Sequence, residues 1–402
     1  MLRKTSVAPP EWTPPAKNKV RQCLDISVIL PLFGGGPEPR TVVAVEPVRP
    51  ASVRGHLRYW WRVLYGVSFQ SPDKLFEQER ELWGSAETFG QVELSVRVTD
   101  RGTDTTCSQL AGTPHPRTGP GLGYFLFPFA AEKATNTPEA VGKMGIKFSL
   151  TLEFPTAYTS ALENTLKAWL TFGGIGARTR RGCGALSGPQ QYLPPHAPPD
   201  LEKWLSSLCA HDPVQSPATT LLHGSSLLLG PKCSNAMEAW EQLARFWAAF
   251  RKGHVAGVPY QPMSGGHWSD YGTLATLSSA KTKRVRLNKP YLGLPIIYQE
   301  VRGARFKGSL EPTCSGRMAS PVILKPIVLQ DKSVRPALLV LRAPEPEGVR
   351  LRETGAYYDL VANLGDEVLK RLGGVGPLGA VIEAAKRHFG KDCLVFTIGG
   401  TK

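Results

Sequence analysis

The sequence predicts an α+β fold of two tandem domains, and three observations support this prediction. The chain has 402 residues, 42% of them hydrophobic, which is more than a single core usually accommodates. Strand-like alternation and helical periodicity follow one another in both halves. A proline-rich stretch at 194–217 separates the halves. We therefore expect a flexible segment at 1–20, domains at 21–193 and 218–402, and a connection between them.

The first half begins with a predicted strand and a predicted helix. Apolar residues alternate with polar or small ones over 23–30, as in a half-buried strand, and a glycine turn follows at 34–36. We expect a helix that is capped by Ser52 and runs to about Tyr65, because its apolar residues recur on one face. That face should pack on a sheet.

The remaining signals of the first half complete a β-α-β-β-α-β order. Alternation predicts strands at 92–98 and 146–154, with an insertion at 100–140 between them. Helical spacing predicts a second helix at 162–170, and a short last strand should end near Leu193. This order is typical of a ferredoxin-like (RRM-like) domain, in which both helices cover one face of a four-stranded antiparallel sheet.

The second half shows a related pattern with more decoration. An apolar run leads into a strongly periodic helix, a loop-like middle follows, and further strand-like and helical segments end the chain. The apolar run is 227–229, the periodic helix is 237–250 and the loop-like middle is 253–272. Strand-like runs follow at 292–298, 321–329 and 337–341, then helical patterns at 357–372 and 378–389, and a terminal segment at 394–398. We expect a second ferredoxin-like domain with helical insertions.

The charge of the chain points to a polyanionic partner. Lys and Arg outnumber Asp and Glu by 48 to 33, a net charge of +15, which favours nucleic acid. The sequence lacks an apolar run long enough to span a bilayer and an apolar signal-peptide core. We expect a cytoplasmic protein with no membrane partner. Seven scattered cysteines without a C-x-x-C pair indicate reduced thiols and no zinc site, and we expect no cofactor.

Three arginines recur every fourth residue along the first predicted helix: Arg54, Arg58 and Arg62. They form one edge of the helix, with guanidinium groups about 6 Å apart, a spacing similar to that of RNA phosphates. None has a carboxylate three or four residues away. We predict that they bind phosphate, and the alternative is a solvated helix edge.

A segment rich in glycine and arginine follows the second predicted helix, at 173–184. Its glycines let backbone N–H groups approach an anion, and its arginines add charge. It matches neither a P-loop nor a dinucleotide fingerprint. The alternative is a flexible connection whose glycines only turn the chain. The predicted RNA-binding residues are Gly173, Gly174, Gly176, Arg178, Arg180 and Arg181.

A second concentration of positive charge covers 270–342, where thirteen Lys and Arg stand against four Asp and Glu. Such clustering favours a groove that follows a nucleic-acid backbone. An acidic protein neighbour is the open alternative. Trp268 and Tyr271, at its start, could stack bases. The predicted RNA contacts are Lys281, Lys283, Arg284, Arg286, Arg305, Lys307 and Arg317.

Known catalytic motifs match this sequence poorly. The sequence contains neither H-E-x-x-H nor G-x-S-x-G. His56, with Tyr59 one turn later, could serve general acid–base cleavage of RNA. However, His56 lies about 160° from Arg58 around the helix, which makes joint action on one phosphate awkward. We predict no enzymatic activity, and the alternative is a metal-independent endoribonuclease that uses His56.

Several phrases resemble the RAMP superfamily, and within it the head subunits of type III-B (Cmr) CRISPR effector complexes. The helix phrase PASVRGHLRYWWR follows an FGGG turn, and the Gly/Arg segment follows the second helix, as in that family. Further matching phrases are LWGS, GLP and RMASP. The resemblance is strong over 24–100 and 145–186 and patchy over 195–285 and beyond 345.

The resemblance implies two tandem ferredoxin-like RAMP domains in a non-catalytic subunit that serves antiviral defence. It implies CRISPR RNA and target RNA as ligands, contacted near the 3′ end of the CRISPR RNA, and neighbouring RAMP subunits as protein partners. The alternative within the superfamily is an endoribonuclease that processes CRISPR RNA with His56.

Overall fold

The computed structural model describes residues 18–69, 71–112, 121–209, 219–254, 268–277, 283–298 and 307–399. Its first sheet has the order β2-β5-β1-β6, and neighbouring strands are antiparallel. The strands are β1 (Lys19–Val28), β2 (Glu93–Asp100), β5 (Lys147–Pro155) and β6 (Leu186–Ser187). Opposed apolar pairs such as Leu24 with Leu150 and Ile26 with Phe148 fix the register, because a slip by one residue would expose them.

Two helices, α1 (Pro50–Tyr65) and α5 (Thr159–Phe172), pack together on this sheet. The expected cap of α1 is wrong. Arg49 holds the N-cap position without a side-chain cap hydrogen bond, and Pro50 occupies the first turn, where its missing N–H costs nothing. The helix α2 (Pro72–Trp83), which the sequence analysis did not identify, packs beside α1.

The second four-stranded sheet repeats this arrangement with the order β11-β12-β7-β15. Its strands are β7 (Leu221–Leu229), β11 (Val322–Val328), β12 (Val334–Arg342) and β15 (Leu394–Thr397), and its helices are α7 (Ala236–Lys252) and α10 (Pro377–Phe389). In each sheet the first strand along the chain lies between the third and the last.

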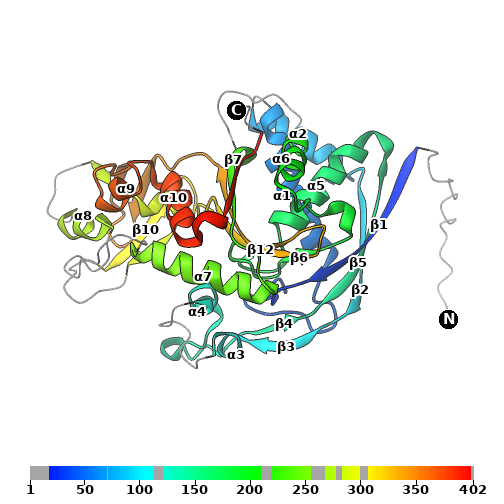
Figure 1. Ribbon diagram of the computed structural model, residues 1–402, viewed down its shortest axis with the longest axis horizontal. Helices are drawn as coiled ribbons and strands as arrows, with labels where there is room; N and C mark the ends of the chain where they lie inside the picture. Colours follow the sequence, from blue (N-terminus) through cyan, green and yellow to red (C-terminus); the bar gives the residue numbers. More distant parts are fainter. Residues whose placement is uncertain are drawn as a thin grey trace, which may run out of the picture.

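The two sheets and their helices form four layers (Figure 1). The helices α1 and α5 lie between the sheets, in one hydrophobic cluster that holds Leu57, Leu166, Leu227 and Leu339. The helices α7 and α10 cover the other face of the second sheet, where Leu228 belongs to a second cluster. Because the end of β7 is buried on both faces, its last three residues, 227–229, form an apolar run rather than an alternating pattern. The hydrophobic core therefore crosses the expected domain boundary.

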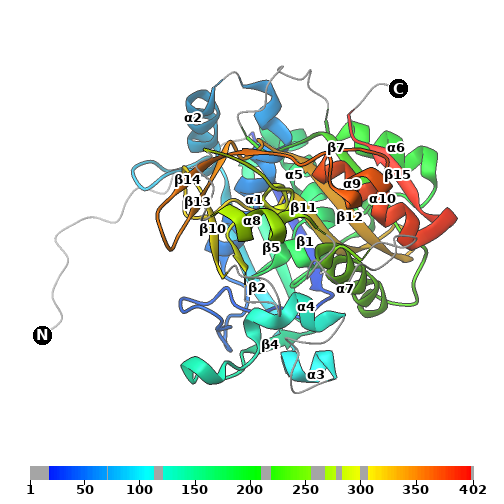
Figure 2. The same cartoon turned by 90° about the vertical axis from the view of Figure 1, so that its left-hand side faces the viewer.

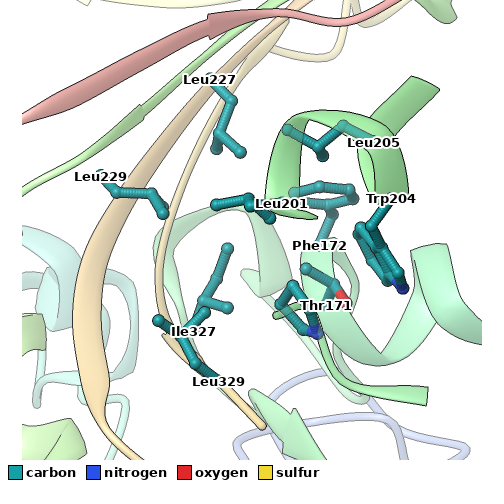
Figure 3. Close-up of a pocket in the computed structure, with 10 residues that line it drawn as sticks. Thr171, Phe172, Leu201, Trp204, Leu205, Leu227, Leu229, Ile327 and Leu329 are labelled. Atoms are coloured by element: carbon teal, nitrogen blue, oxygen red, sulfur yellow. The ribbon is translucent and has the colours of Figure 1, made fainter. Parts of the chain in front are cut away.

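The proline-rich connection contributes α6 (Pro198–Ser207), which covers the edge between α5 and the second sheet. Figure 3 shows Leu201 and Leu205 of α6 facing Leu227 and Ile327 across an apolar pocket. The side chains fill it so closely that no water molecule fits. The described part of the connection, up to Cys209, is therefore a packed element of the core.

We expect Leu201→Ala to lower the free energy of unfolding by about 2 to 3 kcal/mol, because Leu201 is 1% exposed and its truncation leaves a cavity. Urea unfolding followed by circular dichroism measures this change. Glu202→Ala, at an exposed position of the same helix, serves as the control. A loss below about 0.5 kcal/mol for Leu201→Ala would show that α6 does not pack as described.

A third sheet is inserted into the second half, with the order β8-β14-β13-β10-β9. Its strands are β8 (Arg284–Arg286), β9 (Ile296–Tyr298), β10 (Gly308–Pro312), β13 (Gly348–Leu351) and β14 (Tyr357–Val361), accompanied by α8 (Asp270–Leu277) and α9 (Glu367–Arg371). It lies at the opposite end of the molecule from the first sheet (Figure 1), and Figure 2 shows it from the front.

This inserted sheet corrects two expectations. The insertion is mainly a sheet, not helical, and the helix expected at 357–372 is wrong over its first part. Tyr357–Val361 is a strand because its aromatic and β-branched residues suit a sheet, and β13 and β8 flank it on both sides. A smaller insertion in the first half holds β3 (Thr103–Thr106), α3 (Cys107–Ala111), α4 (Leu122–Leu126) and β4 (Val141–Met144).

Candidate nucleic-acid interface

The Gly/Arg segment leaves α5, packs against the turn that follows β1, and returns to β6. The Ala177 N–H donates to the Phe33 carbonyl at 2.7 Å, and the Gly184 N–H donates to the Pro31 carbonyl at 2.9 Å. Gly176 has φ +83°, and a Cβ there would lie 2.8 Å from the Phe33 oxygen. Glycine is therefore needed where the two turns approach each other.

The hydrogen bonds of this loop revise the role expected of its glycines. Besides Gly184, the N–H of Gly173 donates to the Trp169 carbonyl at 2.8 Å, and that of Gly182 donates to Thr179 at 3.1 Å. These three donors are used within the fold and not held ready for an anion. Gly173, Gly176 and Gly184 serve close packing, and the charge of the loop lies with its arginines. Anion binding by the N–H groups of Gly174 and Gly176 stays a prediction.

The three arginines of the loop reach three different elements. Arg180 donates to the Tyr59 hydroxyl of α1 at 3.0 Å. The Arg178 guanidinium carbon lies 5.2 Å from the ring centre of Phe127, just after α4. Arg181 donates to the Val322 carbonyl of β11 at 2.7 Å and to the Ser320 hydroxyl at 3.2 Å. The loop therefore presents cations at the meeting point of α1, the first-half insertion and the second sheet.

Burial leaves part of this charge uncompensated. Desolvation is the main cause that lowers the pKa of Arg178. Desolvation, followed by the neighbouring charges of Arg178 and Arg251, lowers the pKa of Arg181 further. Among the described residues, neither arginine has a carboxylate within ion-pair distance. A bound anion would supply the missing counter-charge.

The arginine edge of α1 is partly neutralised by a residue from α2. Arg58 Nε and Arg62 Nη1 each lie 2.6 Å from the same Glu79 carboxylate oxygen. Glu79 is 3% exposed, whereas the side chains of Arg58 and Arg62 are 27% and 34% exposed. The side chain of Arg54 makes no ion pair or hydrogen bond within the described parts of the chain. It lines a shallow surface depression together with Arg58.

Sequence reasoning missed Glu79 because it searched for carboxylates only within the first helix. A usable signal existed: Glu79 shares the buried face of α2 with Leu75, Leu82 and Trp83. A carboxylate within an apolar stripe indicates a buried ion pair.

The surroundings of His56 disfavour its charged form. Burial, followed by the nearby charge of Arg180, lowers the pKa of His56 to about 4. Its imidazole is therefore neutral at neutral pH, so it is not available as an imidazolium acid, and only a role as general base is compatible with this state. The Tyr59 hydroxyl next to it already accepts the hydrogen bond from Arg180.

The predicted contacts of the second half are dispersed. Arg284 and Arg286 are exposed on the edge strand β8, Lys283 is exposed just before it, and Lys307 and Arg317 are exposed on either side of β10. Lys281 and Arg305 lie outside the described residues. The described cations belong to the inserted sheet and the segments next to it, and not to the Gly/Arg loop or α1.

Base stacking by Trp268 is excluded by its burial. Trp268 is 0% exposed and donates its indole N–H to the Phe250 carbonyl at 2.9 Å, so the expectation that it stacks bases is wrong. Tyr271 packs edge-on against Tyr298, with ring centres 5.0 Å apart. Trp268 belongs to the core beneath α7, whereas Tyr271 is half-buried against the core of the inserted sheet.

Another residue that the sequence analysis did not single out is Lys325 of β11. It is 2% exposed, and its amine donates to the carbonyls of Leu170 and Gly173 at 3.1 and 2.8 Å. It therefore caps the C-terminus of α5, where carbonyls lack helical partners. Burial lowers the pKa of Lys325 to about 7. The sequence signal for this buried amine was the position of Lys325 within the apolar run VILKPIV.

Two classes of site receive no support in the described part of the chain. His, Cys, Asp and Glu do not gather there in a group of three that could hold a metal ion. Among the described helices, none combines the length and apolarity needed to cross a bilayer.

The sequence is similar to a known protein family and to two known proteins. Residues 25–187 match the model of the RAMP superfamily. Two proteins of Pyrococcus furiosus are similar: the CRISPR system Cmr subunit Cmr1-1 is 28% identical over 142 residues, and Cmr1-2 is 26% identical over 175 residues. These alignments cover 35% and 40% of this chain. They span 40% of the length of Cmr1-1 and 91% of Cmr1-2.

Solved structures share the fold at low sequence identity. The crystal structure of apo Cmr1 from Pyrococcus furiosus has a TM-score of 0.52 at 16% identity, covering 82% of this chain and 90% of that chain. A chain in the cryo-EM structure of the type III-B Cmr-beta complex, bound to cognate target RNA and AMPPnP, has a TM-score of 0.50 at 12% identity. It covers 91% of this chain and 99% of that chain.

Proposed function

This chain belongs to the RAMP superfamily through residues 25–187, and from this premise we propose that it is a non-catalytic RNA-binding subunit of a type III-B CRISPR effector complex. It would act in cytoplasmic antiviral defence. Its ligands would be guide and target RNA near the 3′ end of the CRISPR RNA, and a neighbouring RAMP subunit would dock against it. The similarity to Cmr1-1 and Cmr1-2 supports the complex as its setting.

We further propose that the two four-stranded sheets are tandem ferredoxin-like RAMP domains at 21–193 and 218–402. Their matching strand orders support this assignment. The second domain would then carry the inserted five-stranded sheet between its repeated elements.

The observation that carries the RNA-binding proposal is the position of the Gly/Arg loop beside α1. Arg180 lies on Tyr59, and Arg54 lies on the same helix as Tyr59, with no side-chain partner among the residues that the structure describes. Arg178 and Arg181 add half-buried charge that no carboxylate of the described segments pairs with. Guanidinium groups bind phosphate oxygens well. Contacts of this kind would bind the RNA backbone without recognising the base sequence.

Arg54→Ala, Arg178→Ala and Arg180→Ala, combined in one variant, should weaken binding of single-stranded RNA about 10- to 100-fold. Arg181 is kept, because it holds Val322 and Ser320 in place. The dependence of log affinity on log salt should become shallower by about 2, since each lost phosphate contact removes about 0.7. Fluorescence anisotropy across a salt series in EDTA measures both quantities.

The control removes three exposed cations elsewhere, Arg21, Arg97 and Lys203, and so matches the change in net charge. Equal losses in both variants would mean that only total charge matters, and the proposed site would be rejected. The products are also resolved on a denaturing gel. Discrete cleavage in EDTA that disappears in His56→Ala would replace the proposal with the endoribonuclease alternative.

A further inference from the structure

Phe127 presents an aromatic ring at the surface, beside apolar side chains that are buried. It lies directly after α4 and is 42% exposed, whereas Phe125, Leu126 and Phe129 are between 0% and 3% exposed. Phe129 stacks on Phe33 of the turn that follows β1, with ring centres 4.6 Å apart. The buried neighbours therefore hold the backbone of Phe127 in place, while its own ring stays accessible.

The guanidinium group of Arg178, in the Gly/Arg loop, lies against this ring. Its central carbon is 5.2 Å from the ring centre of Phe127, which is the geometry of a cation–π contact. Arg178 has φ +57°, in the left-handed region that glycine adopts more easily than any other residue. Since the backbone here would suit glycine better, the contribution of Arg178 to the loop lies in its side chain.

This guanidinium group is able to bind a further group. Among the described residues the side chain of Arg178 has no hydrogen-bond partner, and its buried Nε is left unsatisfied. Arg180, two residues further on, stacks on Tyr59 at 5.2 Å, and both arginines are partly exposed. A base lies within the same nucleotide as its phosphate. A phosphate bound by Arg178 would therefore bring a base to the ring of Phe127.

We propose that Phe127 is a stacking platform for one base of the single-stranded RNA whose backbone Arg178 and Arg180 bind. This inference rests on the proposed function and extends it from the phosphates to a base. Proteins that bind single strands commonly stack unpaired bases on aromatic rings beside cationic groups. Because every base has a flat face, the contact adds affinity with little dependence on sequence. Phe127 thus takes the stacking role that burial denies to Trp268.

Phe127→Ala should weaken binding of an unstructured single-stranded RNA of about 20 nucleotides roughly 10-fold. The salt slope should stay unchanged, because no phosphate contact is lost. A strand of the same length made of abasic nucleotides keeps the phosphates and lacks the bases. The wild type and Phe127→Ala should bind this abasic strand with equal affinity. Fluorescence anisotropy with both labelled strands measures these quantities.

Three further variants define the chemistry of the contact. Phe127→Trp keeps a flat ring and should retain the wild-type affinity for RNA, whereas Phe127→Leu keeps only apolar bulk and should bind as weakly as Phe127→Ala. Phe76→Ala is the matched control, because Phe76 is 53% exposed on α2. It should bind both strands like the wild type. Circular dichroism melting verifies that each variant is folded.

The outcomes separate this inference from the proposed function. If the Arg54, Arg178 and Arg180 variant loses affinity as expected while Phe127→Ala binds RNA like Phe76→Ala, the stacking platform is rejected and the phosphate site stands. If Phe127→Ala weakens binding of RNA and of the abasic strand equally, Phe127 only positions Arg178, and stacking is rejected. Wild-type affinity in Phe127→Leu would reject it as well. If the wild-type chain binds neither strand, both proposals are rejected.

Discussion

Replacing Lys325 with Met should remove about 3 to 5 kcal/mol of variation in the free energy of unfolding between pH 7 and pH 10. Burial lowers the pKa of Lys325 from 10.5 to about 7, and one pKa unit corresponds to about 1.4 kcal/mol. Between these values the unfolded chain carries a proton that the folded chain has released. The wild-type fold should therefore gain stability as the pH rises through this window.

Urea unfolding of the wild type and Lys325→Met at several pH values between 6.5 and 10 tests this prediction. The loss of the hydrogen bonds to Leu170 and Gly173 adds an offset, so the slope against pH is the quantity to compare. Lys203→Met is the control, because Lys203 is exposed on α6. Parallel profiles for all three proteins would show that the Lys325 amine titrates normally in the fold.

Gly184→Ala should lower the free energy of unfolding by about 4 kcal/mol. Gly184 has φ +64°, which costs an L-residue about 1 kcal/mol or more. An added Cβ would also collide with the Ile175 carbonyl, which is backbone and cannot move aside alone. The collision would strain the hydrogen bonds from Gly184 to Pro31 and from Ile175 to Gly184, each contributing about 1 kcal/mol.

Thermal and urea unfolding measure the effect of Gly184→Ala, with Gly55→Ala as the matched control. Gly55 lies within α1, and no atom lies within 4 Å of its added Cβ. Gly55→Ala should therefore stabilise the protein by about 0.5 to 1 kcal/mol. A loss below about 1 kcal/mol for Gly184→Ala would show that the Gly/Arg loop is a flexible connection.

Elements with strong local periodicity could be predicted from the sequence. The regular alternation of 146–154 and the apolar face of 237–250 correspond to β5 and α7. The β-α-β-β-α-β order of the first half agrees with the observed strands and helices. The family resemblance, carried by the helix phrase and the Gly/Arg segment, is confirmed by the RAMP match over 25–187.

Prediction failed where neighbours distant in sequence decide the structure. Residues 357–361 form a strand because β13 and β8 flank them, although the pattern over 357–372 suggested a helix. Trp268 appeared available for stacking, but the end of α7 buries it. The packing role of Gly176, which approaches the Phe33 carbonyl, likewise depends on a turn distant in sequence.

The order of most core elements, the excess of positive charge and the arginines of the candidate interface could be predicted from the residues alone. Which of those charges are compensated depends on the packing of distant elements. Glu79 lies 21 residues from Arg58, and Lys325 lies 155 residues from Leu170. Periodicity reports only which face of an element is buried. The partners that a buried charge meets depend on how the layers stack, which no local window of the sequence contains.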